Sequence, residues 1–381
     1  MSVRRSIAPE SSLEAYRNPQ FRQLPDHVAA LFTDASEASF FNLAAWYDLM
    51  VQHAMEPGSR SVLYVGSGAG MRVALPCLEL TLQGTRELRG FCNAYSCEHA
   101  IIRDPSADDC AAAVETLLRE IGREQASVDT ITLPGHSRSD RAFPAMLAGL
   151  RGAGFIARPV FDSGTWYEGV KDVSFADYLG RRPAELKNTW RRKSAALQKT
   201  GRLALRFFTA ADDIERYIAD YATVYQRSWK PSERFPHFIP ALIREAAGLG
   251  ALRFGILYLD ETPAAAQFWI VWKGRAVIYK LAHDERLRNF SPGTVLTMRM
   301  IERALETERL EEINFGRGDD AYKRLWLSQR RERWGIAAAN PRTARGLARG
   351  LRLLAARARD RLLGRGTHED TVAASAVAQV T

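Results

Sequence analysis

The chain has 381 residues, of which 46% are hydrophobic and 25% charged, and its formal net charge is +9. This balance excludes a largely disordered protein, and no uncharged apolar run reaches the roughly 18 residues that a membrane-spanning helix needs. The N-terminal segment lacks the apolar core of a secretory signal peptide, so we expect a cytoplasmic protein. At this length two domains are expected rather than one.

The four cysteines lie in the first third of the chain, at Cys77, Cys92, Cys97 and Cys110. So few cysteines in a large chain without an export signal do not build a disulfide framework. The nearest histidine, His99, does not complete a zinc pattern with them. We expect unpaired, mostly buried thiols and no metal site.

Hydrophobic patterns predict the elements of the first half in chain order. They are a helix over 40–54, strands over 61–65 and 72–80, a helix over 108–125, a strand over 131–133 and a helix over 143–151. The glycine run between the first two strands, Gly66-Ser67-Gly68-Ala69-Gly70, is similar to a nucleotide-binding fingerprint. That fingerprint needs a helix after the glycines, whereas here an extended, proline-stopped segment follows, so we predict a hairpin turn.

The second half repeats this order in longer form, beginning with a basic helix. Helices are predicted over 183–199, 212–225, 240–249, 294–308 and 320–331, and strands over 203–208, 252–259, 264–272, 276–283 and 312–315. Aspartates are expected to cap the 212–225 helix. The mixed order predicts an α/β fold with a mixed sheet, and the two halves read as two versions of one unit.

The segment 291–294, Ser-Pro-Gly-Thr, opens the helix that follows the third strand of the second half. Gly293 lets the backbone approach a ligand closely, and the first-turn amides of the helix are unpaired. Unpaired amides and the positive helix end suit a pyrophosphate, and Arg286 and Arg288 lie just upstream. A plain strand-to-helix loop, capped by Ser291, fits the same residues.

Residues 319–323, Asp-Asp-Ala-Tyr-Lys, open the last predicted helix beside that loop. Tyr322 could donate a proton to a leaving thiolate, since its pKa lies close to that of a thiol; alternatively, Tyr322 and Trp326 are core aromatics at helical spacing. Two candidates for a general base, His283 and Asp284, follow the strand that would line the cleft. His283 has the suitable pKa, but a loop histidine facing solvent fits equally.

Several short motifs of the second half occur together in a distinctive order and spacing. They are Tyr279-Lys280, Ala282, Asp284, Ser291-Pro292-Gly293, Gly318-Asp319, Tyr322-Lys323 and Trp326. This set resembles the CelD/BcsL-like acyltransferases, which are GNAT-superfamily proteins related to the FemAB peptidyltransferases. Upstream, residues 186–199 are similar to the family's basic helix, and Arg227-Ser228-Trp229 to its arginine–tryptophan element. The resemblance covers residues 160–335 best.

The resemblance implies tandem GNAT-like domains, over 1–160 and 161–340, followed by a basic tail over 341–381. It also implies direct transfer of an acyl group from acyl-CoA, such as acetyl-CoA, to an amine or hydroxyl group. The acceptor would be a saccharide or a cell-envelope or exopolysaccharide precursor. Cellulose synthesis is one setting associated with such proteins. A backbone amide near Leu281 would hold the tetrahedral oxyanion. Tyr322 occupies the position of the superfamily's frequent general acid.

Other roles carried over by position concern ligand binding. The coenzyme pyrophosphate would contact Arg288, Ser291, Gly293 and Thr294, and the substrate would contact Trp229, Gln267, Lys280, Asp319 and Lys323. The usual GNAT loop has a glycine where this chain has Ser291, so the loop departs from the pattern at that position.

The positive charge is concentrated in two segments. Six basic residues lie between 187 and 202, and eight arginines between 342 and 365 face a lone Asp360. The tail is predicted to form a helix over 343–363 with one leucine stripe, followed by a disordered end after Gly366. Such a helix could dock peripherally on the inner membrane, or pack on the body with its arginines in solvent.

Two functional alternatives remain open at this point. The first is FemAB-like aminoacyl transfer from charged tRNA, in which the basic helix would touch RNA phosphates and nucleic acid would be a partner. The second is a GNAT-like module without catalytic activity that assists polysaccharide synthesis.

Overall fold

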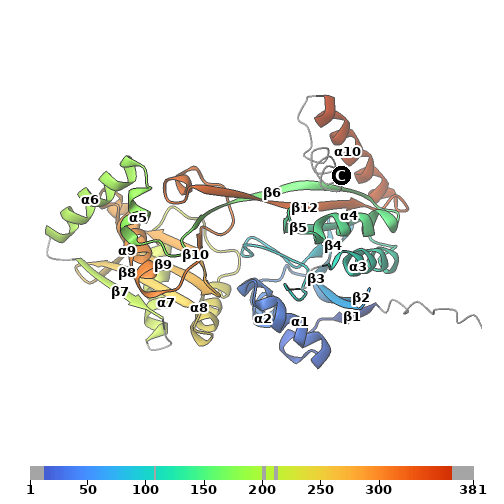
Figure 1. Ribbon diagram of the computed structural model, residues 1–381, viewed down its shortest axis with the longest axis horizontal. Coiled ribbons are helices and arrows are strands. Elements are labelled where there is room, and N and C mark those ends of the chain that lie inside the picture. Colours follow the sequence, from blue (N-terminus) through green and yellow to red (C-terminus); the bar gives the residue numbers. More distant parts are fainter. Residues whose placement is uncertain (1–12, 107–108, 200–202, 210–212, 363–381) are drawn as a thin grey trace, which may run out of the picture.

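The computed structural model describes residues 13–106, 109–199, 203–209 and 213–362. Within them the chain forms one twelve-stranded sheet in the order β1-β2-β3-β4-β5-β12-β6-β11-β10-β9-β8-β7 (Figure 1). None of the helices in this part of the chain is long and apolar enough to cross a membrane. The four cysteines are unpaired; three are buried and Cys97 is half-buried, as predicted.

The first half begins with strand β1 and two α-helices, and then builds five strands around two more α-helices. Its elements are β1 (Glu14–Arg17), η1 (Phe21–Gln23), α1 (Asp26–Ser36), η2 (Phe40–Asn42), α2 (Ala44–His53), β2 (Arg60–Gly68), β3 (Met71–Leu82), β4 (Thr85–Gly90), α3 (Ala111–Glu124), β5 (Thr130–Ser137), α4 (Ala142–Gly152) and β6 (Ile156–Gly169). Ala69 and Gly70, both with positive φ, make the two-residue turn between β2 and β3. The predicted hairpin is therefore confirmed.

The second half inserts two helices and then repeats the first. Its elements are α5 (Phe175–Gly180), α6 (Ala184–Lys199), β7 (Leu203–Phe208), α7 (Ile214–Gln226), α8 (Phe238–Gly248), β8 (Leu252–Leu259), β9 (Thr262–Trp272), β10 (Arg275–His283), η3 (Glu285–Phe290), α9 (Pro292–Thr307), β11 (Glu312–Asn314), η4 (Ala321–Leu325), β12 (Gln329–Ala339) and α10 (Ala344–Leu362). The series β1-α1-α2-β2-β3-β4-α3-β5 thus corresponds to β7-α7-α8-β8-β9-β10-α9-β11. The prediction of two versions of one unit is confirmed.

The last strands of the two halves are exchanged. β5 of the first half pairs with β12 of the second, and β11 of the second half pairs with β6 of the first. Between them β6 and β12 pair along the whole of β12, and Figure 1 shows these two strands as a long ribbon joining the halves. A boundary at residue 160 would fall within β6.

The predicted helix over 320–331 is wrong. A 3-10 turn, η4, ends at Leu325, and β12 begins at Gln329. Long-range pairing with β5 and β6 on both sides overrides the local helical spacing. Gly335 shows how tightly β12 is enclosed, because a Cβ there would lie 3.1 Å from the carbonyl oxygen of Leu133.

Two expected helix caps are not formed by side chains within the described residues. Asp213 is the N-cap of α7 but takes a left-handed conformation and makes no capping hydrogen bond, and Asp212 lies outside the described residues. Ser291, the N-cap of α9, is likewise left-handed, with φ of 50°, and its side chain does not cap.

Each half contains one parallel strand pair, joined by a crossover helix. The paired residues are Glu87–Arg89 with Thr130–Thr132, and Arg275–Val277 with Glu312–Asn314. Beyond these short contacts the partners separate. We call the resulting openings the first gap, between β4 and β5, and the second gap, between β10 and β11.

Candidate functional site

The second gap opens because its two strands turn toward different neighbours. After β11 the chain follows β6: Phe315 N–H donates to the carbonyl of Trp166, and Gly318 N–H to that of Gly164. β10 carries a bulge at Tyr279, which shifts its register with β9 and re-aims the following residues. The Tyr279 hydroxyl donates to the carbonyl of Tyr95 at 2.7 Å, and so fastens the bulge to the first half.

A pocket of about 260 Å³ fills this opening, and we call it the gap pocket. Its walls come from β10, from the stretch between β11 and η4, from the loop between α7 and α8, and from the first half. The lining residues are Ala94, Tyr95, Cys97, Trp229, Lys230, Ile278, Tyr279, Lys280, Leu281, Phe315, Arg317, Asp320, Tyr322 and Lys323. Both halves therefore contribute to it.

Tyr322 lies on η4, with its ring packed edge-on against Phe315 at 5.9 Å between centroids. Burial, with a smaller contribution from Asp320, raises the pKa of Tyr322 to about 12. The phenol therefore stays protonated across the physiological range and is available as a hydrogen-bond or proton donor. Tyr322 lines the gap pocket, and 42% of its surface is exposed.

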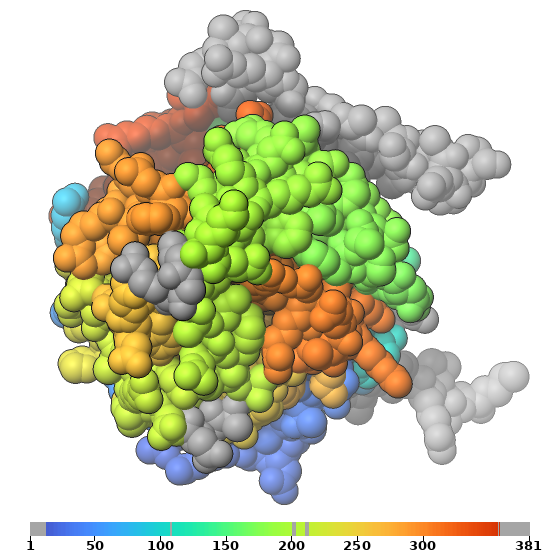
Figure 2. Space-filling model, turned by 90° about the vertical axis from the view of Figure 1, so that its left-hand side faces the viewer, coloured from blue at the N-terminus to red at the C-terminus, as the bar shows by residue number. Residues whose placement is uncertain are grey.

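Lys323 holds η4 in place and does not reach into solvent. Its buried ammonium donates to the carbonyls of Arg317 and Gly318, both at 3.1 Å, and pairs with Asp320 at 3.0 Å. The far end of η4 is anchored by the carbonyl of Trp326, which accepts from the hydroxyl of Tyr178 at 2.8 Å. Figure 2 faces this half, where the green residues of α5 and α6 lie beside the orange residues that follow α9.

A half-buried acid–base cluster lies at the β10 side of the pocket. Lys280 pairs with Glu233 at 2.7 Å, and Glu233 also accepts from the hydroxyl of Tyr95 at 2.7 Å. Lys230 lies beside them, and burial together with the nearby Lys280 lowers its pKa to about 8. At neutral pH this amine therefore loses its proton far more readily than an ordinary lysine.

The N-terminus of α9 presents its first amides without a side-chain cap, as far as the described residues show. Pro292 has no N–H, so Gly293 and Thr294 supply the free donors of the first turn. Arg288 stands just before them, with 75% of its side chain exposed. On α6, the ammonium of Lys193 donates to the carbonyl of Asn289, which places a second basic segment at the same loop. The arrangement suits a phosphate group.

His283 connects this helix start with the gap pocket. A Cβ on Gly293 would lie 3.1 Å from Nδ1 of His283, so the imidazole packs closely against the first turn of α9. The imidazole also packs at a tilt of 44° on Trp229, 4.6 Å between centroids, and Trp229 lines the pocket. Burial lowers the pKa of His283 below its ordinary value.

The other predicted site residues lie away from the pocket wall. Asp284 is buried and bound to the guanidinium of Arg286, which holds the pKa of Asp284 below its ordinary value, and it borders a separate cavity beside Phe290. Gln267 is buried between β9 and α9, where it donates to Thr297 at 3.2 Å.

Asp319 accepts from the indole of Trp166 at 2.8 Å and from Arg330. These bonds tie the entrance of η4 to β6 and β12. Of the predicted residues, the structure thus brings together Trp229, Lys280, Tyr322 and Lys323, with His283 adjacent.

Sequence reasoning missed Tyr95 and Lys230, which line the pocket, and Glu233, which lies behind the lining and binds both Lys280 and Tyr95. Tyr95 comes from the first half, and Glu233 from a loop whose sequence carries no motif. For Lys230 one signal existed, since it directly follows Trp229 of the arginine–tryptophan element.

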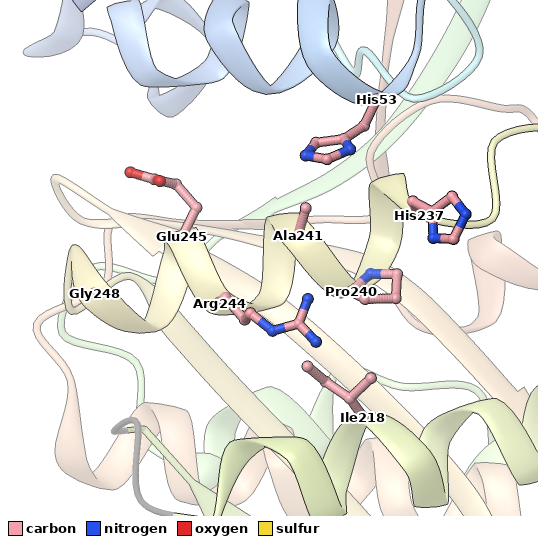
Figure 3. Close-up of a pocket in the computed structure, with 8 residues that line it drawn as sticks. All are labelled: His53, Ile218, His237, Pro240, Ala241, Arg244, Glu245 and Gly248. Carbon is pink, nitrogen blue, oxygen red and sulfur yellow. The ribbon is translucent and has the colours of Figure 1, made fainter.

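A larger cavity of about 810 Å³ lies between α2 and α8 and shares no lining residue with the gap pocket. Figure 3 shows His53 of α2 above α8, with His237, Arg244 and Glu245 along the helix. Arg244 is paired with Glu215 at 2.6 Å. No group of three residues able to hold a metal ion occurs there or elsewhere in the part of the chain that the structure describes.

Comparison with known proteins agrees with this geometry. Residues 184–324 match the model of the acetyltransferase (GNAT) domain. A tandem GNAT protein from the clavulanic acid biosynthesis pathway is similar in structure, with a TM-score of 0.50 and 15% identity over 86% of this chain and 98% of that one. FemX is similar with a TM-score of 0.56 and 10% identity over 85% of this chain and 96% of its own. No curated protein sequence matches the chain.

These likenesses show the fold. The predicted α/β fold of tandem GNAT-like units is confirmed, and the GNAT match covers the half that contains the gap pocket. The narrower resemblance to CelD/BcsL-like acyltransferases stays a prediction.

Proposed function

We propose that this tandem GNAT fold transfers an acyl group from acyl-CoA to an amine or hydroxyl group, with acetyl-CoA as the simplest donor. One observation carries the proposal. In the half that matches the acetyltransferase domain, the opened strand pair holds a pocket with a protonated Tyr322 at its wall, next to the uncapped start of α9. An acyl-CoA needs both features, because the proton donor serves the leaving thiolate and the free amides of α9 bind the pyrophosphate.

In the proposed reaction the pyrophosphate binds at the amides of Gly293 and Thr294 with Arg288 nearby. The acyl thioester then lies along β10, whose backbone from Ile278 onward has lost its β11 partner. The amide near Leu281 stabilises the oxyanion as the acceptor's lone pair adds to the carbonyl carbon. The C–S bond breaks, and the thiolate takes a proton from Tyr322.

The acceptor's proton goes to a base, for which three side chains are candidates. Asp284 is committed to Arg286 and borders a different cavity, so it is the least suited. His283 and Lys230 flank Trp229 at the pocket, and the pKa of each lies low enough for a neutral form near physiological pH.

For the acceptor we propose a saccharide or another envelope or exopolysaccharide precursor. The support is the resemblance to CelD/BcsL-like acyltransferases, together with a pocket lined by charged and hydrogen-bonding groups such as Lys280, Arg317 and Asp320. Since acyl-CoA is a cytoplasmic metabolite, the reaction would take place on that side of any membrane. Gln267 and Asp319 would act by positioning α9 and η4.

Aminoacyl transfer from charged tRNA is the second candidate. The observation in its favour is the basic run Arg191, Arg192 and Lys193 of α6, whose Lys193 contacts the loop before α9. The same run could bind the phosphates of RNA or those of CoA.

Calorimetric titration of the full chain with acetyl-CoA, longer acyl-CoAs and aminoacyl-tRNA tests the proposal. We expect micromolar binding of a CoA ester, weakened by Arg288→Gln, and release of free thiol when amino sugars and polysaccharide fragments are added. Binding of aminoacyl-tRNA but of no CoA ester would establish the second candidate instead. Binding of neither would leave a module without catalytic activity.

A further inference from the structure

Helix α10 carries an exposed stripe of leucines. Leu347, Leu351 and Leu354 are 44%, 58% and 48% exposed, and their spacing aligns them along one line of the helix. They make up three of the nine large hydrophobic side chains exposed in the described residues. A continuous apolar line on the surface is typical of an interaction site, whereas single exposed leucines are common.

A different face of α10 packs on the body, and this fixes the rotation of the helix. A Cβ on Gly346 would lie 2.1 Å from the carbonyl oxygen of Asn340, and one on Gly350 would lie 2.6 Å from Cδ1 of Ile156. Arg158 donates to the carbonyl of Leu353 at 3.1 Å and adds a further tie to β6. Because these two glycines lie directly against the body, the rotation of α10 keeps Leu347, Leu351 and Leu354 in solvent.

The remaining face is strongly basic. Residues 344–362 contain six arginines and one aspartate, and Arg345, Arg349 and Arg352 are exposed on the side away from the leucines. In Figure 1 α10 stands out from the body beyond the ends of β6 and β12, so both faces can be approached. A helix with one apolar and one arginine-rich face matches the helices that lie in a membrane interface.

We propose that α10 docks the protein on an anionic membrane surface, with the leucine line entering the boundary between headgroups and acyl chains. Arginines attract anionic headgroups, and leucines gain by leaving water, so a membrane uses both faces. A nucleic acid would use the arginines alone and leave the leucines exposed. This inference is independent of the acyl transfer proposed above.

Co-sedimentation of the full chain with vesicles tests this proposal. We expect binding to phosphatidylcholine vesicles containing 30% phosphatidylglycerol, on the order of tenfold weaker binding to pure phosphatidylcholine, and weakening by salt. The triple change Leu347→Ser, Leu351→Ser and Leu354→Ser should reduce binding at least tenfold. Leu82→Ser, at another exposed leucine, is the matched control and should bind normally.

Circular dichroism reports whether the variants stay folded, which the exposed positions of the leucines make the expected result. Three outcomes would overturn the proposal. The intact chain could fail to bind the anionic vesicles, the triple serine variant could bind them as well as the unchanged chain, or duplex DNA could bind while vesicles do not.

Discussion

The two gaps lie in strand pairs of the same order, but side chains fill the first gap whereas the second gap holds a pocket. In the first gap the chain that leaves β4 folds back into the opening: the N–H of His99 donates to the carbonyl of Gly135, and its ring lies 3.4 Å from Nε2 of His136. A Cβ on Gly90 would lie 2.7 Å from the ring of His99, so this imidazole packs directly against β4. The second gap keeps a pocket with Tyr322 at its wall.

The helices that follow the gaps differ in the same sense. At the start of α3 the carboxylate of Asp109 accepts from the N–H of Ala111 at 3.0 Å, which satisfies an amide and places negative charge at the helix end. At the start of α9 the side chain of Ser291 makes no such bond within the described structure, and Arg288 adds positive charge. An anion is repelled at the first helix and attracted at the second.

The segment that closes the first gap also builds the second site. Tyr95 and Cys97 line the gap pocket, and a Cβ on Gly316 would lie 2.8 Å from Sγ of Cys97. The first half thus supplies structural residues to the site of the second half. The comparison predicts that substitutions in the second gap alter catalysis, whereas substitutions in the first gap alter the stability of the fold.

The largest expected effect is that of Tyr322→Phe. Removing the phenol proton donor should slow thiol release roughly 10²- to 10⁴-fold, because a general acid contributes about that much. Binding of acetyl-CoA should be unchanged, since the ring still packs on Phe315. Tyr217→Phe, at a ring stacked on Phe208 outside the pocket, is the control. A rate for Tyr322→Phe within twofold of the unchanged enzyme would remove Tyr322 as the acid.

Acid titration probes the first gap. Burial lowers the pKa of His99 to about 4 and that of His136 well below its ordinary value. The unfolded chain then binds more protons, so the free energy of unfolding should fall as pH drops below about 6.5, by up to about 1.4 kcal/mol per pH unit for each histidine. Urea unfolding at pH 7.5, 6 and 5 measures this slope. It should flatten in His99→Gln but not in His237→Gln, and an unchanged slope in His99→Gln would contradict the assignment.

The base of the second gap is identified from the pH dependence of kcat/KM. If Lys230 takes the acceptor's proton, the rate should rise about tenfold between pH 7 and pH 9, with a midpoint near its pKa of about 8. The charged groups around it are Lys280, Glu233, Lys323 and Asp320. Lys230→Met should then abolish the rise, whereas a midpoint below the ordinary histidine pKa of 6.5 that disappears in His283→Gln would assign the base to His283.

The smallest effect is expected from placing a carboxylate at the start of α9, where α3 has Asp109 just before its own N-cap. Ser291→Asp should weaken CoA binding about three- to tenfold, because a carboxylate would occupy the amides and oppose the pyrophosphate. The left-handed conformation at this position tolerates both Asp and Asn, so Ser291→Asn is the matched neutral control. Calorimetry compares the two, and equal affinities would show that the pyrophosphate binds elsewhere.

Features that depend on neighbouring residues were predictable from the sequence. The β2–β3 hairpin and the helix after residue 291 both follow from short-range patterns. The local pattern over 320–331 predicts a helix, but the segment from Gln329 is a strand because it pairs with β5 and β6, which lie far away in sequence. Tyr95 and Glu233 were missed for the same reason, since only the tertiary fold carries them to Lys280.

The strand exchange has a consequence for biosynthesis. β5 lies early in the chain, yet its partner on one side is β12, with Thr130 opposite Ala339. During translation one edge of β5 therefore stays unpaired until almost the whole described chain has left the ribosome. Unpaired edges invite association with other chains, so this protein is exposed to misassembly during synthesis, and any truncation before β12 prolongs that exposure indefinitely.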